Sequence, residues 1–186
     1  MKKFKYIAFN KPFGVLTQFT GDKNDRTLSE FNLPKDIYAA GRLDKDSEGL
    51  LILTDDGIFN QRLTNPSSKK YKTYHVQVEK IPTESSLQEL RDGVLIKDYK
   101  TKPSQVKILH DYNIEERNPP VRFRKNIPTC WLEIKIIEGK NRQVRRMTAK
   151  IGHPTLRLIR YSIGDISIKD ILVGEFKHVS KKDILK

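Results

Sequence analysis

The most informative segment of the sequence covers residues 41–57 and reads Gly-Arg-Leu-Asp-Lys-Asp-Ser-Glu-Gly-Leu-Leu-Ile-Leu-Thr-Asp-Asp-Gly. Its four consecutive aliphatic residues, 50–53, predict a buried strand, and residues 55–57 predict the turn that ends it. Asp44 lies on the polar stretch before this strand, two residues after the cation Arg42. A loop held at both ends by rigid elements can present a reactive group to a large substrate. Asp44 is therefore the first candidate for a functional residue.

Short strands and helices are expected on both sides of this segment. Apolar and alternating runs predict strands at residues 4–10, 37–40, 73–78, 106–109, 131–137 and 156–163. Capping residues and apolar spacing predict helices at 58–63, 83–91 and 140–151, and a capping box at 27–30 opens a shorter helix. Residues 115–128 form a long loop that contains Arg117, Arg122 and Arg124. This order predicts an α+β fold, in which a largely antiparallel, twisted mixed sheet is flanked by helices.

The length of 186 residues predicts one domain over 1–186. A chain this long buries about 70% of its unfolded surface, so it needs no disulfide or metal ion to hold it together. The single cysteine, Cys130, lies in an apolar run and is predicted to be a small core residue. No apolar stretch approaches the ~18 residues of a membrane span, and residues 1–10 do not fit a signal peptide. A cytoplasmic protein is therefore expected.

The charge of the chain is strongly basic and unevenly distributed. Lys and Arg number 36 against 23 Asp and Glu, which gives a formal net charge of +13. Seven of the basic residues, and no acidic one, fall between positions 140 and 160. Proteins of this kind are plausible polyanion binders, because binding displaces counterions from phosphates. The candidates for phosphate contacts are Arg145, Arg146 and Lys150.

The predicted helix at 140–151 fits this interpretation, since its apolar and basic residues fall on opposite sides. The apolar side carries Val144, Met147 and Ile151, and the basic side carries Arg142, Arg146 and Lys150. A basic run of this kind can be a solvated helix face, or a helix N-terminus suited to phosphates.

Asp44 and Tyr74 each have an ordinary alternative. Asp44 can form a local salt bridge with Arg42 or Lys45, and Tyr74 can be a simple strand aromatic rather than a stacking platform for an RNA base. Positions 44–55 also match much of an EF-hand calcium loop, with Asp or Glu at its first, third, fifth and twelfth positions. Against calcium, the twelfth ligand is normally Glu and the flanks do not predict helices of the required length. No metal site is therefore expected.

The order of four motifs resembles that of the RsuA-type ribosomal RNA pseudouridine synthases. Residues 10–17, Asn-Lys-Pro-Phe-Gly-Val-Leu-Thr, resemble the opening motif of that family, and residues 41–57 its catalytic motif. Residues 72–74, Lys-Thr-Tyr, resemble its base-stacking motif, and residues 138–147 its third motif. Residues 117–120, 127–129 and 156–161 resemble members of the family that act on the large-subunit (23S) RNA. No S4-type RNA-binding domain is expected, which fits the same members.

The resemblance implies the roles of the site residues. Asp44 is the essential carboxylate, which attacks C1′ of the ribose, adds to C6 of the uracil, or removes a ribose proton. A basic residue of the third motif pairs with it, and both Lys140 and Arg142 are candidates. Three further residues would contact the target nucleotide. Arg42 fills the gap left by the flipped nucleotide, Tyr74 stacks on the base, and Leu158 packs beside the uracil.

The same resemblance implies an enzyme that needs no cofactor or metal and has large-subunit ribosomal RNA as its partner. A monomer that does not bind a membrane is expected. Two other classes fit part of the sequence. A non-catalytic RNA-binding or ribosome-assembly protein would share the charge but would not require Asp44 and Tyr74 together. A calcium-binding module would require Asp46 and Asp55 as much as Asp44.

Overall fold

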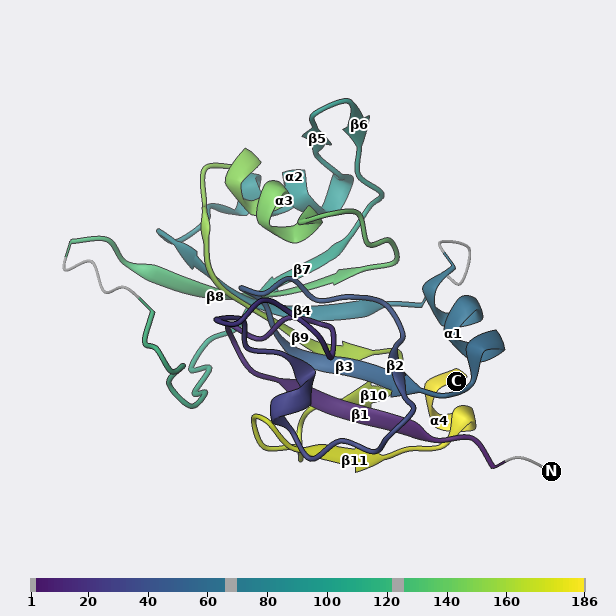
Figure 1. Cartoon of the computed structure of the whole chain (residues 1–186). Coiled ribbons are helices and arrows are strands. Elements are labelled where there is room, and N and C mark those ends of the chain that lie inside the picture. Colours follow the sequence, from purple (N-terminus) through teal and green to yellow (C-terminus); the bar gives the residue numbers. More distant parts are fainter. Residues whose placement is uncertain (1–2, 66–69, 122–125, 186) are drawn as a thin grey trace. The chain divides into compact units, whose positions relative to one another are not determined.

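Figure 1 shows the computed structural model of the protein, which describes residues 3–65, 70–121 and 126–185. Arg122 and Arg124 of the predicted basic loop lie outside the described residues. The chain divides into two compact units, of which residues 1–70 and 160–186 form the first and residues 71–159 the second. The single domain expected over 1–186 stays a prediction.

The first unit contains a sheet and short helices. Its elements are β1 (Tyr6–Lys11), the 3-10 helix η1 (Leu28–Glu30), β2 (Tyr38–Ala39), β3 (Glu48–Thr54), α1 (Gly57–Thr64), the end of β9 (Thr155–Ile163), β10 (Ile166–Ser167), β11 (Phe176–His178) and α4 (Lys181–Leu185). The strand order is β11-β1-β3-β9. Strand β1 is antiparallel to both β11 and β3, and β2 and β10 pair antiparallel with β3 and β9.

Strand β3 is the centre of the first unit. All seven of its residues are buried, which explains why its sequence is a continuous apolar run rather than an alternating one. On one face, its side chains pack with those of β1 and of the segment between β1 and β2. This cluster contains Ile7, Phe9, Val15, Leu28, Ile37, Leu51 and Leu53. The predicted capping box is confirmed, because Thr27 and Glu30 bond to each other's backbone at the start of η1.

The second unit pairs a sheet with two helices. Its elements are β4 (Lys72–Glu79), α2 (Glu84–Asp92), β5 (Leu95–Ile96), β6 (Tyr99–Lys100), β7 (Gln105–Ile108), β8 (Thr129–Ile136), α3 (Gln143–Lys150) and the start of β9. The strand order is β9-β4-β8-β7, and β8 is antiparallel to both of its neighbours. In Figure 1, α2 and α3 lie over the same face of this sheet, and β5 and β6 form a hairpin beside them.

The helix-covered face of the second unit holds its core. Every second residue of β8 is buried, as expected for a strand with one face in a core. These residues pack against Leu87 and Leu90 of α2 and Val144 and Met147 of α3. The helix predicted at 83–91 is confirmed, with Thr83 as its N-cap and Gly93 as its C-cap. The α+β fold is thus the one that the sequence predicts.

Two elements differ in detail from the prediction. Helix α3 begins at Gln143 rather than at residue 140, because Arg142 has a left-handed backbone (φ 50°) that interrupts the helix. Strand β4 was predicted to be half-buried, but Thr73 and His75 are buried as well. His75 is covered by the segment that follows β7, from which Tyr112 packs edge-on against its ring.

Two expectations about the whole chain can be compared with the structure. Cys130 is a free, buried thiol of the second core, as predicted. Among the described residues, no helix is long and apolar enough to cross a membrane.

Gly49 of β3 is a position that only glycine fits. Its φ is +102°, and a Cβ there would overlap the carbonyl oxygen of Arg160 and lie 2.9 Å from its nitrogen. We expect Gly49→Ala to lower the free energy of unfolding by at least about 2 kcal/mol, because strained backbone and overpacking each cost about 1–3 kcal/mol. Urea unfolding, followed by circular dichroism, measures this change.

Gly57 provides the matched control. It opens α1, has no positive φ, and a Cβ added there meets nothing within 4 Å. Gly57→Ala should leave the stability unchanged or raise it slightly, since alanine restricts the unfolded chain. Equal urea midpoints for the two variants would show that β3 tolerates a side chain at Gly49.

Candidate functional site

The loop that carries Asp44 is tied by its backbone to the segment after β1. The hydroxyl of Thr17 donates to the carbonyl of Leu43 (2.6 Å) and accepts from its N–H (3.2 Å). The N–H of Gly14 donates to the carbonyl of Lys45 at 2.8 Å. These bonds hold the residues on both sides of Asp44, so the position of its Cα is fixed within the first unit.

Two buried cations lie beneath the same loop. Lys11, at the end of β1, is fully buried, and its Nζ donates to the carbonyls of Pro12 (2.8 Å) and Val15 (2.7 Å). Arg160 of β9 is only 5% exposed. Its Nε donates to the carbonyl of Leu50 at 2.8 Å, and its Nη1 lies 3.4 Å from the carbonyl of Arg42. One guanidinium therefore links β3 to the loop before Asp44.

The electrostatic surroundings of Lys11 connect it to Asp44. Burial lowers the pKa of Lys11 to about 8, against the opposing effect of nearby carboxylates, of which Glu48 is the strongest. Asp44 is one of these carboxylates, and Arg160 adds to the lowering. Lys11 is still mostly protonated at pH 7, so it supplies buried positive charge close to the Asp44 loop.

Lys11 and Arg160 are functional candidates that the sequence did not single out. A lysine that ends an apolar strand just before proline was the signal available for Lys11. Arg160 gave no comparable signal, because it belongs to a basic run whose members are mostly expected at the surface. Their burial depends on contacts between segments far apart in the chain.

The neighbours of Asp44 have different partners. Lys45 pairs with Asp25 at 2.7 Å, and this hydrogen bond is the main reason that the pKa of Asp25 is lowered. Arg42 has an exposed side chain, and Asp44 is partly exposed. The structure thus presents Arg42 and Asp44 on one loop, as the sequence predicts.

The calcium loop considered at 44–55 does not fit the structure. An EF-hand curls its twelve residues around one ion. Here, residues 48–54 form strand β3, whose seven residues extend over roughly 20 Å and separate the carboxylates at its two ends. Within residues 3–65, 70–121 and 126–185, no group of three or more His, Cys, Asp or Glu is arranged to hold a metal ion.

The second unit brings together two of the predicted substrate contacts. Tyr74 of β4 and Leu158 of β9 belong to the same core cluster as Val144 and Met147 of α3. Tyr74 is 8% exposed and Leu158 5%. Both side chains therefore lie on the helix-covered face of the sheet.

The third motif forms a turn ahead of α3. The buried side chain of Gln143 accepts from the N–H of Lys140 (2.9 Å) and donates to Glu138, which fixes the path of the turn. The ammonium of Lys140 lies 3.7 Å from the ring centre of Tyr99. Arg142 is exposed at the N-cap. Whether Lys140 or Arg142 pairs with Asp44, which belongs to the first unit, stays a prediction.

The basic residues of α3 lie away from its core side. Arg145 and Arg146 are partly exposed and Lys150 is exposed, whereas Val144 and Met147 are buried. Arg146 is partly held in place, because its guanidinium donates to the side chain of Asn141 at 2.9 Å. The predicted separation of basic and apolar sides along this helix is confirmed.

Comparisons with known proteins place this geometry in a family. A crystal structure of a pseudouridylate synthase superposes with a TM-score of 0.79 and 29% identity, covering 99% of this chain and 74% of that one. Two bacterial proteins, each named ribosomal large subunit pseudouridine synthase E, are similar in sequence. The protein of Vibrio vulnificus (strain CMCP6) is 58% identical over 95% of this chain and 75% of its own length. That of Xanthomonas axonopodis pv. citri (strain 306) is 57% identical over 86% and 85%.

A family model described as RNA pseudouridylate synthase matches residues 5–150, which include all four motifs noted in the sequence. The resemblance inferred from these motifs is therefore confirmed. With this match and identities above 50% over most of its length, the chain belongs to the RNA pseudouridylate synthase family.

Proposed function

We propose that this protein isomerises one uridine of the large-subunit (23S) ribosomal RNA to pseudouridine, with Asp44 as the essential carboxylate. The names of the relatives from Vibrio and Xanthomonas support the substrate. The observation that carries the role of Asp44 is its loop, whose backbone is held by Thr17 and Gly14 above two buried cations. Catalytic groups work best when their surroundings fix them before the substrate binds.

The reaction breaks the N-glycosidic bond of a uridine, turns the uracil and rejoins it through carbon. An ionised Asp44 would attack C1′ of the ribose, add to C6 of the uracil or remove a ribose proton. Each of these steps needs a carboxylate in its charged form. The buried cations Lys11 and Arg160 belong to the same unit as the loop that carries this carboxylate.

The target uridine must leave its helix to reach the carboxylate. In this proposal, Tyr74 stacks on the uracil, Leu158 packs beside it, and the exposed Arg42 takes the place of the flipped nucleotide. Lys140 or Arg142 would pair with Asp44. Lys140 gives a single point charge, whereas Arg142 offers a planar fork that can contact both carboxylate oxygens.

The remaining parts of the proposal concern the protein as a whole. It would act as a monomer in the cytoplasm, with one catalytic domain over residues 1–186, and would need no metal ion or cofactor. Activity measured in EDTA tests the independence from metal ions, and the protein's mass in solution tests whether it is a monomer.

Asp44→Asn should abolish pseudouridine formation while RNA affinity stays nearly unchanged, since the substitution keeps the shape of the side chain. Loss of an essential catalytic carboxylate typically costs at least about four orders of magnitude in rate. Tritium release from 23S RNA labelled at C5 of uridine measures the rate, and filter binding measures the affinity.

Asp46→Asn is the control for this experiment. Asp46 lies on the same loop, and its negative charge, like that of Asp44, raises the pKa of Lys11. It should retain most of the activity. If Asp44→Asn keeps more than a few per cent of the wild-type rate, Asp44 is not the catalytic carboxylate. An inactive wild type that binds RNA normally would favour the non-catalytic RNA-binding alternative.

Lys11 predicts a dependence of stability on pH. Its pKa of about 8 in the folded protein lies below the ordinary value near 10.4, so the unfolded chain binds more protons between these values. The free energy of unfolding should therefore rise with pH in this window. Relative to Lys11→Met, the wild type should gain about 2 kcal/mol between pH 7 and pH 10.

Urea unfolding of both proteins at each pH measures this difference. The pKa of Tyr6 is raised to about 12 by burial and by its hydrogen bond to Asp56. Tyr6 is present in both proteins, so its contribution to the pH dependence cancels in the difference between them. A difference that is flat or that shrinks with pH would show that Lys11 stays fully charged in the fold.

The basic side of α3 predicts a change in salt dependence. Replacing Arg145, Arg146 and Lys150 by alanine should weaken RNA binding and flatten the slope of log K against log salt by about 0.7–0.9 for each lost phosphate contact. The single-turnover rate at saturating protein should not change.

Three exposed lysines of the first unit, Lys169, Lys177 and Lys182, form the matched control, because their removal subtracts the same charge. Their triple alanine variant should keep nearly the wild-type slope. Equal slopes for the two triple variants would place the RNA elsewhere.

A further inference from the structure

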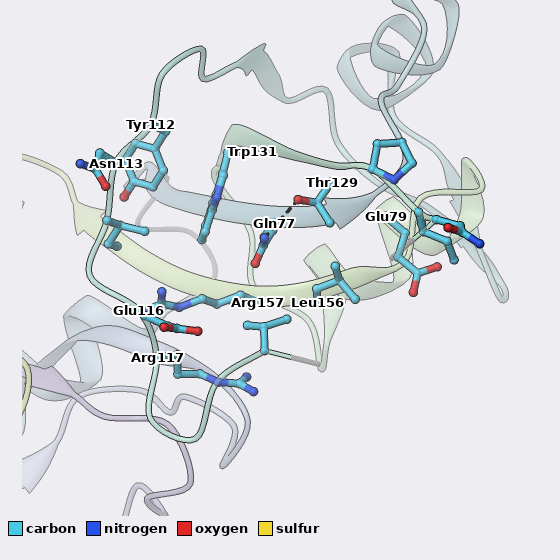
Figure 2. A pocket seen from close by; sticks show the side chains of 15 residues that line it. Gln77, Glu79, Tyr112, Asn113, Glu116, Arg117, Thr129, Trp131, Leu156 and Arg157 are labelled. Carbon is cyan, nitrogen blue, oxygen red and sulfur yellow. Dashed lines mark hydrogen bonds between the residues drawn. The ribbon is translucent and has the colours of Figure 1, made fainter. Parts of the chain in front are cut away.

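The second unit contains a cavity that the proposed reaction does not use. Its volume is about 700 Å³, within the range of ligand sites. Figure 2 shows its described lining, which comes from strands β4, β8 and β9 and from the segments on either side of residues 122–125. Trp131 stands near the middle of the view, between Tyr112 on one side and Gln77 and Thr129 on the other.

Strand register assigns the floor of this cavity to one face of the sheet. Gln77 of β4 lies opposite Trp131 of β8, and Glu79 lies opposite Thr129. Side chains alternate between faces along a strand, so these residues point away from the core side that holds Tyr74. Within the second unit, the cavity is therefore on the face of this sheet opposite to Tyr74 and Leu158.

Trp131 is held in a fixed orientation. The ring of Tyr112 packs against it edge-on, with the centroids 5.0 Å apart, and the Tyr112 hydroxyl lies 2.6 Å from Nδ1 of the buried His75. The guanidinium of Arg157 lies 6.0 Å from the Trp131 ring and donates to the carbonyl of Glu115 at 2.8 Å. A partly exposed indole that is braced in this way is a ready platform for a planar ring.

The polar groups beside the indole select among planar rings. Gln77 uses one amide N–H to bond the hydroxyl of Thr129 at 3.3 Å. Its amide also has a second N–H and a carbonyl oxygen, and this donor and acceptor pair matches N7 and the exocyclic amine of adenine.

Among the described residues that line the cavity, formal charges are balanced, and this balance favours a neutral ring over a phosphate. The part of the lining that the structure describes includes two carboxylates and two guanidinium groups. These belong to Glu79, Glu116, Arg117 and Arg157. A site built for phosphate would show an excess of positive charge instead.

We propose that this cavity binds an unpaired adenine nucleotide of RNA, with its base stacked on Trp131 and its edge toward Gln77. The choice of an RNA strand as the source rests on the proposed function, whereas the recognition of adenine does not. A second base contact of this kind would add sequence selectivity to the non-specific attraction of phosphates.

Trp131 is the only tryptophan of the chain, so its fluorescence reports directly on this cavity. The whole protein is titrated with oligoadenylate and oligouridylate of equal length and with AMP, and free N-acetyltryptophanamide corrects for absorption by the nucleotides. We expect oligoadenylate to quench the fluorescence at concentrations about tenfold lower than oligouridylate does. That ratio is the size of one good bidentate base contact.

Gln77→Ala tests the contact while keeping the reporter. It should weaken quenching by oligoadenylate about tenfold and bring it near that of oligouridylate. Gln88→Ala, an exposed glutamine of α2, is the control and should behave as the wild type. Thermal unfolding followed by circular dichroism checks that both variants are folded.

The outcomes that overturn the proposal are specific. Equal quenching by the two oligomers, or an unchanged response of Gln77→Ala, would remove adenine from this cavity. Quenching by AMP as strong as by oligoadenylate would assign the cavity to a free nucleotide rather than to RNA. Pseudouridine formation, assayed in parallel, separates the two proposals: selective quenching without activity refutes only the proposed function, and activity without quenching refutes only this site.

Discussion

The first unit depends on the close approach of two strand backbones, β3 and β9, at Gly49 and Arg160. A side chain at Gly49 would overlap the carbonyl of Arg160, so the strands can come this close only where one residue lacks a Cβ. Because β9 lies so near, the side chain of Arg160 reaches the carbonyls of Leu50 and Arg42. The geometry of the loop that carries Asp44 follows from this contact.

Burial of two cations beneath one loop is costly, and their hydrogen bonds offset part of that cost. An unpaired buried charge is strongly destabilising, but Lys11 and Arg160 donate to backbone carbonyls. The lowered pKa of Lys11 shows that compensation is incomplete. Buried charges of this kind are common at functional sites. This agrees with a catalytic role for the loop above them.

The sheet of the second unit has two faces with different chemistry. Its core face is apolar, is covered by α2 and α3, and carries Tyr74 and Leu158. The opposite face has a tryptophan braced by Tyr112 and Arg157 next to the amide of Gln77. One short sheet can carry both an apolar core face and a polar face with an aromatic ring, since adjacent residues of a strand point to opposite faces. Strands β4 and β9 thus contribute Tyr74 and Leu158 to the proposed uridine site and Gln77 and Arg157 to the cavity on the opposite face.

Local sequence determined the elements and the motifs. The aliphatic run 50–53 predicted a buried strand, Thr83 and Gly93 predicted the ends of α2, and the order of the motifs predicted the family. These features depend on residues close together in the chain, where backbone preference and periodicity act. Asp44 was likewise identifiable from its own loop, although its role stays a prediction.

Contacts between distant segments determine which polar residues are buried and which side chains meet. The left-handed backbone of Arg142 makes α3 begin at Gln143, and the side chains of Lys11 and Arg160 are buried. Gln77 lies opposite Trp131, although 54 positions of sequence separate them. Each of these depends on the pairing of distant strands. A shift of one residue in the pairing of β4 and β8 would move every side chain of one strand to the other face. No pattern within a single segment contains that register, so the cavity and the buried cations could not be read from the sequence.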